Sequence, residues 1–118
     1  MNYVQRNKKR MLLIDKLNFP KQIRGLFPNN SYAHESTKFQ IAHKLLKDGF
    51  EVYPEQDFKS GGRADLVAID KYGNGFIIEV LETETEEEFR LNKLEKYPQE
   101  FTILSVKCKD FDILKWYL

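Results

Sequence analysis

Three carboxylates stand at positions in the sequence where carboxylates are unusual. Glu79 interrupts an apolar run at 76–81 (FIIEVL), and Asp65 opens another at 65–69 (DLVAI). Glu35 lies in a segment of helical periodicity, in line with its apolar side. A buried carboxylate is costly unless it is paired, hydrogen-bonded or bound to a cation. Carboxylate oxygens are ligands that Mg²⁺ prefers, so these three groups, if brought together, would form a divalent-metal site.

Each carboxylate also has an ordinary structural explanation. Glu35 could reach solvent or interact with the dipole of its helix. Glu79 could form an ion pair with Arg63 or with a lysine. Asp65 and Glu79 lie on two strands joined by a short turn, which would bring two like charges together. Like charges held close need a counter-ion or a proton.

The elements that would position these groups follow from periodicity and turn residues. Ser31 is a good helix N-cap, and Gly49 suits the left-handed end of the same helix. Gly73 and Asn74 favour a hairpin turn between two strands. The predicted elements are a basic helix at 4–17, a helix at 31–48, strands at 50–53, 65–69, 76–81 and 101–106, and a charged helix at 86–96. This order predicts an α/β fold with a small mixed sheet flanked by helices.

On the helix at 31–48, the wheel places Phe39, Ala42 and Leu46 within about 40° of Glu35. We therefore expect Glu35 to share the face that meets the sheet. His34 points about 100° away on the same wheel and is not expected to be a ligand.

Basic residues gather near the N-terminus. Asp15 is the one acid among seven basic residues: Arg6, Lys8, Lys9, Arg10, Lys16, Lys21 and Arg24. A basic segment of this kind suggests a polyanionic partner such as DNA, although it could also be a solubilising tail. Pro20, Gly25 and Pro28 then break the pattern, which divides the chain into an arm or helix with a connector at 1–30 and a domain at 31–118.

Composition narrows the class of protein. The chain has 118 residues, a net charge of +1 and 42% hydrophobic residues, which fits one globular domain. No apolar run approaches the length of a membrane span, so no membrane partner is expected. Cys108 is the single cysteine, which excludes an intrachain disulfide and a cysteine-rich metal site. An intracellular, cytoplasmic setting is the expectation.

The ordered pattern resembles the PD-(D/E)XK nuclease superfamily, particularly its archaeal Holliday junction resolvase branch. The matching residues are Glu35 on a helix, the segment 61–65 (GGRAD) before a strand, and Glu79 in the next strand. The resemblance covers about residues 31–106. It implies a restriction-endonuclease-like core, with Glu35, Asp65 and Glu79 as ligands of Mg²⁺ or Mn²⁺. Ala64 stands at the proline position of the motif.

Leu81 is the main departure from that pattern, because it occupies the position of the catalytic lysine. That lysine orients the attacking water and stabilises charge on the phosphate. Lys93 is the first substitute we expect, since the segment 93–97 (KLEKY) resembles the Gln-x-x-x-Tyr element of RecB-like members. Lys38, one turn from Glu35, is the second. Either lysine could equally be a solvated surface residue.

The resulting hypothesis is a metal-dependent DNA endonuclease or resolvase-like phosphodiester hydrolase. The nucleic-acid contacts would come from Arg6, Lys8, Lys9, Arg10, Lys59 and Arg63. A homodimer would let two sites address two strands. Leu81 keeps open a catalytically inactive nuclease fold that binds nucleic acid or protein. A third hypothesis is a regulatory interaction domain that uses Trp116 and Tyr117.

Overall fold

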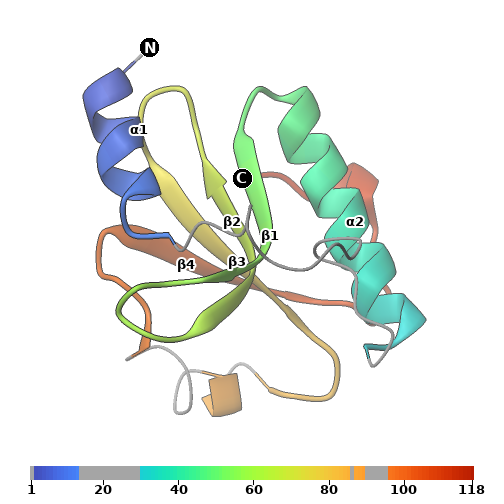
Figure 1. Cartoon of the computed structure of the whole chain (residues 1–118). Helices are drawn as coiled ribbons and strands as arrows, with labels where there is room; N and C mark the ends of the chain where they lie inside the picture. The colour runs from blue at the N-terminus through green and yellow to red at the C-terminus, as the bar shows by residue number, and fades with distance from the viewer. Residues whose placement is uncertain (1, 14–29, 86, 90–95) are drawn as a thin grey trace, which may run out of the picture.

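The computed structural model of the chain describes residues 2–13, 30–85, 87–89 and 96–118. It is a mixed α/β fold, as predicted, with a four-stranded sheet between helical segments (Figure 1). The elements are α1 (Tyr3–Arg10), α2 (Tyr32–Lys47), β1 (Glu51–Asp57), β2 (Arg63–Ile69), β3 (Gly75–Leu81), β4 (Phe101–Lys107) and the short 3₁₀ helix η2 (Ile113–Lys115).

The strands follow their sequence order across the sheet, β1-β2-β3-β4. β1 pairs antiparallel with β2 and β2 antiparallel with β3, whereas β3 and β4 are parallel. β3 is therefore an inner strand, in keeping with its apolar residues on both faces. The turn between β2 and β3 is held by Asp70, whose side chain accepts hydrogen bonds from the backbone amides of Tyr72 and Asn74. Gly73 takes the positive φ of 90° that this turn requires.

Each face of the sheet carries its own apolar core. α2 covers one face, where Ile41 and Leu45 pack against Leu66, Ala68 and Ile78. The other face is covered by the segment after α1 and by residues from the β3–β4 connection. Its core comprises Leu13, Phe58, Ala64, Val67, Ile69, Ile77, Leu81, Phe89, Tyr97 and Phe101.

The ends of α2 confirm the capping prediction. The Ser31 hydroxyl accepts a hydrogen bond of 3.1 Å from the backbone amide of His34. Gly49 follows the helix with φ of 90°, a conformation that glycine adopts without strain. The N-terminus of α2 is thereby fixed at residue 32, which determines where the side chains of its first turns lie.

The prediction that Pro54 ends the first strand is wrong. β1 continues to Asp57, and Pro54 pairs with Leu66 of β2. β1 is an edge strand, so a missing backbone N–H on its outer side removes no ladder hydrogen bond. The extension matters because it brings Glu55 into the sheet beside β2.

Less can be said of the predicted helix at 86–96 and of the C-terminus. Residues 87–89 are helical, and residues 90–95, including Lys93, lie outside the described residues. The C-terminal segment, undecided from the sequence, turns through η2 and packs beside α2 (Figure 1). Within the described parts of the chain, no helix is long and apolar enough to cross a membrane.

The basic N-terminal segment is docked on the domain. α1 ends at Arg10, earlier than predicted, and residues 14–17 of the predicted helix lie outside the described residues. The backbone amide of Asn2 donates a hydrogen bond to the carbonyl oxygen of Lys71, and Leu13 forms an isolated antiparallel β-bridge with Phe58. The guanidinium groups of Arg6 and Arg10 form ion pairs with Glu51 of β1.

These ion pairs give a first prediction. Arg6→Gln should lower the free energy of unfolding by about 1 kcal/mol, because it leaves the half-buried Glu51 with one cation fewer. Lys8→Gln, an exposed residue of the same helix, should change it by less than about 0.5 kcal/mol. Urea denaturation of the two variants measures the difference. Equal stabilities would show that the Arg6 contact with Glu51 contributes nothing to docking.

Candidate active site

Three carboxylates lie on neighbouring strands towards one end of the sheet. Pro54 pairs with Leu66 and Gln56 with Ala64, so Glu55 of β1 lies level with Asp65 of β2. The pairing of β2 with β3 ends at Leu66 and Ile78, and Asp65 and Glu79 are the next residues of the two strands. Like charges that lie close on neighbouring strands destabilise a sheet. We call Glu55, Asp65 and Glu79 the carboxylate row.

Asp65, at the centre of the row, is neutralised by neighbouring donors. It accepts a hydrogen bond of 2.7 Å from the backbone amide of Val80, and its Oδ2 lies 3.4 Å from His34 Nε2. Burial alone would raise the pKa of Asp65, but the hydrogen bonds from His34 and Val80 and the charge on His34 hold it below its usual range. Asp65 is therefore ionised at neutral pH.

Glu79 is 2% exposed and forms a hydrogen bond with Tyr97. The Tyr97 hydroxyl donates to its carboxylate, and that hydroxyl also lies 3.0 Å from the carbonyl oxygen of Arg63. The Arg63 guanidinium pairs with Asp57, at 2.8 Å. The Tyr97 hydroxyl thus stabilises this end of the row.

Glu35 approaches the row from the first turn of α2. Its Oε1 accepts a hydrogen bond of 2.7 Å from the Asn30 amide and lies 3.1 Å from His34 Nδ1. Its Oε2 is buried and 2.9 Å from Lys38 Nζ, at an angle that does not make a hydrogen bond. Burial raises the pKa of Glu35, and Lys38, Asn30 and His34 together hold it below its usual range.

Lys38 completes the cluster and is 2% exposed. Its Nζ lies 2.9 Å from Glu35 Oε2 and 2.9 Å from Glu55 Oε1, so one ammonium joins the helix to the edge strand. Burial raises the pKa of Glu55, and Lys38 opposes that rise. Both carboxylates that contact Lys38 are more stable as anions in its presence.

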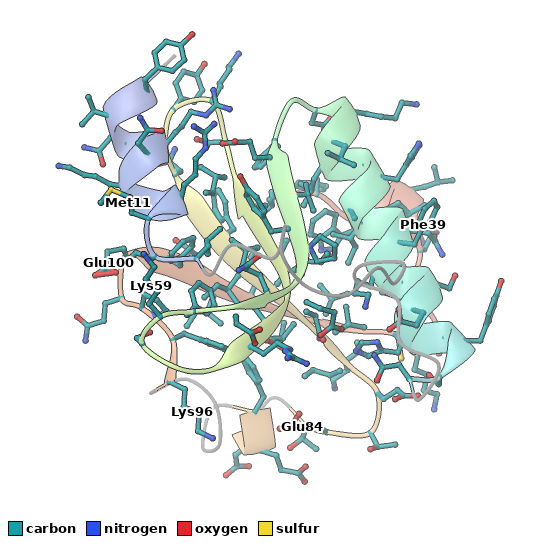
Figure 2. All side chains as sticks on the ribbon, viewed as in Figure 1. Met11, Phe39, Lys59, Glu84, Lys96 and Glu100 are labelled. Atoms are coloured by element: carbon teal, nitrogen blue, oxygen red, sulfur yellow. The ribbon has the colours of Figure 1, made fainter. Side chains whose placement is uncertain are left out.

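The predicted orientation of α2 is wrong by about one residue. Its buried face consists of His34, Thr37, Lys38, Ile41 and Leu45. Phe39 and Leu46, expected to meet the sheet, are 62% and 57% exposed, and Figure 2 shows Phe39 on the side of α2 that faces away from the sheet. The rotation brings His34 into the site and leaves Glu35 at its edge.

The physical reason is that three of the five buried residues of α2 are polar. The positions of apolar residues identify the buried face of a helix correctly only where apolar packing alone determines which face is buried. Lys38 and His34 are buried because carboxylates of the sheet and helix compensate their desolvation. In an isolated sequence they resemble surface residues.

Glu55 is the acidic member of the site that the sequence analysis missed. The premature end assigned at Pro54 placed it in a loop. Its φ of 46° lies in the left-handed region, which is rare for glutamate and interrupts strand alternation. As a result Glu55 and Gln56, adjacent in the chain, are both buried. No periodic pattern in the sequence signals this burial.

The other predicted residues have more varied placements. Leu81 is 2% exposed and belongs to the apolar core, so its side chain does not stand in for a cation. Lys8 and Lys59 are exposed, and the backbone amide of Lys59 donates to the carbonyl of Leu12 just after α1. Figure 2 shows Lys59 on the same side of the molecule as Met11 of this segment.

The donor chemistry of the cluster suits a hard divalent cation, because its anionic groups are carboxylates. The present arrangement does not yet provide the spacing. Within the described ranges, no three His, Cys, Asp or Glu side chains are placed to hold one metal ion. The His34 ring lies between Glu35 and Asp65, which it contacts through its two nitrogens. A cation binding both carboxylates would have to displace that ring.

Comparison with known proteins adds no family to this description. No family model matches the chain, and no curated protein or solved structure matches it significantly. The function must therefore be inferred from the residues of this chain and their geometry.

The position of His34 makes stability depend on pH. Its hydrogen bond to Asp65, opposed by burial and supported by Glu35, raises the pKa of His34 from 6.5 to about 9. The charged ring therefore stabilises the fold fully below pH 6.5, and this contribution is lost as the pH rises through about 9. The loss should amount to about 1–3 kcal/mol of unfolding free energy.

Urea denaturation at about pH 6 and about pH 9.5 measures this loss in the wild type and in two variants. His34→Gln should lack most of the pH-dependent difference. His43→Gln, which changes an exposed histidine of the same helix, should retain it. The same pH dependence in wild type and His34→Gln would contradict the assignment.

Proposed function

We propose that this chain is a PD-(D/E)XK-type nuclease that hydrolyses phosphodiester bonds of DNA with Mg²⁺ or Mn²⁺. The observation that carries the proposal is the cluster of Glu35, Glu55 and Asp65 around His34 and the buried cation of Lys38, with Glu79 on the strand next to Asp65. Buried clusters of titratable groups with perturbed pKa values are characteristic of functional sites. A purely structural role would not require so many buried charges in one place.

The order of elements supports the same proposal. A helix is followed by three antiparallel strands, a connection and a fourth strand parallel to the third. This is the arrangement expected of a restriction-endonuclease-like core, in which the second and third strands carry the motif carboxylates. Asp65 and Glu79 occupy those strands here.

In the proposed site Glu35, Asp65 and Glu79 would hold the metal ion. The ion would activate water and neutralise charge on the scissile phosphate. His34 would release Glu35 and Asp65 when its ring moves aside. Tyr97 would orient Glu79 through its hydroxyl, and the Val80 amide would orient Asp65.

Lys38 is the cation we propose for phosphate stabilisation. Its ammonium is within 2.9 Å of carboxylates from both α2 and β1, whereas Leu81 offers no charge. A buried ammonium in a site of low dielectric interacts more strongly with a developing negative charge than one in water. Lys93, the first substitute expected from the sequence, remains a candidate among the residues that the structure does not describe.

A catalytically inactive nuclease fold is the second candidate, and Leu81 is the observation that favours it. The core surrounds Leu81 with apolar side chains, so a lysine could not be accommodated there without repacking. In that case the carboxylate cluster would be retained for structure, and the exposed basic residues would bind nucleic acid or protein.

Cleavage of branched and linear DNA separates the two candidates. Glu79→Gln and Lys38→Met should each reduce the Mg²⁺-dependent rate by ~10²–10⁴-fold, since each removes a charged group next to the reacting phosphate. Lys47→Met, an exposed lysine of the same helix, is the control and should retain activity. A wild type that binds Mg²⁺ and cleaves nothing would establish the inactive fold. Full activity in Lys38→Met with loss in Lys93→Ala would transfer the role to Lys93.

DNA binding gives a separate prediction for the exposed lysines. The double variant Lys8→Gln, Lys59→Gln should bind all DNA sequences more weakly, and the slope of log affinity against log salt should fall by about 2. Arg6 and Arg10 are left unchanged because their replacement would remove the ion-pair partners of Glu51. Lys47→Gln, on α2, is the control. Affinity equal to that of the wild type would return the N-terminal segment to a structural role.

A further inference from the structure

Glu55 is held in a conformation that glutamate adopts only under constraint. Its φ of 46° is left-handed, and its side chain is 8% exposed in the edge strand β1. Backbone strain of this kind persists where the surrounding structure over-determines it, and it is frequent at functional sites. The neighbouring pairs, Pro54 with Leu66 and Gln56 with Ala64, keep the strand in register on both sides of the distortion.

The distortion places Glu55 against Lys38. Glu55 Oε1 lies 2.9 Å from Lys38 Nζ, and this hydrogen bond joins residues 17 positions apart in the chain. On its own helix Lys38 has Glu35, three residues earlier, at 2.9 Å. A lysine side chain has four rotatable bonds. A contact with Glu35 of the same helix does not by itself fix where the ammonium lies relative to the sheet. The contact from β1 fixes the ammonium relative to the sheet.

We propose that Glu55 is the positioning residue of Lys38, which it holds beside Glu35. The inference rests on the proposed function for its catalytic consequence. Glu55 acts through Lys38, because its Oε1 accepts a hydrogen bond from the ammonium that also contacts Glu35. A lysine at position 81 would be positioned by the strand itself. Lys38 lies on a helix, and Glu55 fixes its ammonium relative to the sheet.

The test uses the full chain with Glu55→Gln, which keeps the size of the side chain, and Glu55→Asn, which tolerates the left-handed backbone. Glu51→Gln is the control for the position of the ammonium. It removes another half-buried carboxylate of β1, which pairs with Arg6 and Arg10. A Lys38→Met spectrum assigns the Lys38 ammonium signal by its disappearance.

The first measurement is the ¹⁵N–¹H spectrum of lysine ammonium groups in the metal-free protein. A buried, hydrogen-bonded ammonium exchanges slowly with water, so wild type and Glu51→Gln should show the Lys38 signal. Both Glu55 variants should lose or broaden it while their denaturation midpoints show that they are folded. An unchanged Lys38 signal in Glu55→Gln and Glu55→Asn would overturn the inference.

The second measurement is steady-state cleavage and Mg²⁺ titration. Glu55→Gln should lower kcat by about 10–100-fold, with KM for DNA and affinity for Mg²⁺ within about twofold of the wild type, as expected for a misplaced catalytic group. A loss of Mg²⁺ affinity greater than tenfold would make Glu55 a ligand and overturn the positioning role. If the wild type does not cleave DNA, the proposed function fails, and the ammonium spectrum still decides whether Glu55 holds Lys38.

Discussion

Electrostatic repulsion within the carboxylate row is the constraint on which the rest of the site depends. Three carboxylates lie on neighbouring strands towards the same end of the sheet because of the strand register. Their mutual repulsion must be compensated by opposite charge, by hydrogen-bond donors or by a proton. The structure uses the first two, through Lys38 and His34 and through Tyr97 and the Val80 amide.

This requirement explains why α2 turns a partly polar face to the sheet. Burial of Phe39 in place of Lys38 would contribute more apolar area, at about 25 cal/mol per Å². It would also leave Glu35 and Glu55 without their shared cation, and an unpaired buried charge costs about 3–5 kcal/mol. The electrostatic requirement therefore outweighs the hydrophobic one at the N-terminal half of the helix, while Ile41 and Leu45 supply the apolar contact further along.

The sequence was informative where structure is determined locally. Ser31 caps α2 and Gly73 forms the turn because each conformation depends on one or two residues. Glu79 was recognised because it interrupts an apolar strand. Lys38 and Glu55 were not predicted together, since their burial depends on a contact between a helix and an edge strand and on a left-handed φ. Such non-local compensation leaves no periodic pattern in the sequence.

The carboxylate row has a consequence for the order of folding. It is created by two antiparallel pairings between strands that are adjacent in the chain, β1 with β2 and β2 with β3. Adjacent pairings of this kind form early, whereas contacts between distant residues form late. Tyr97, 18 residues beyond Glu79, belongs to the late group. The carboxylates would thus meet before their full set of partners arrives, and the repulsion would raise the folding barrier. Folding should be faster in mildly acidic solution or at high ionic strength, so the feature on which the proposed chemistry rests also slows the assembly of the sheet.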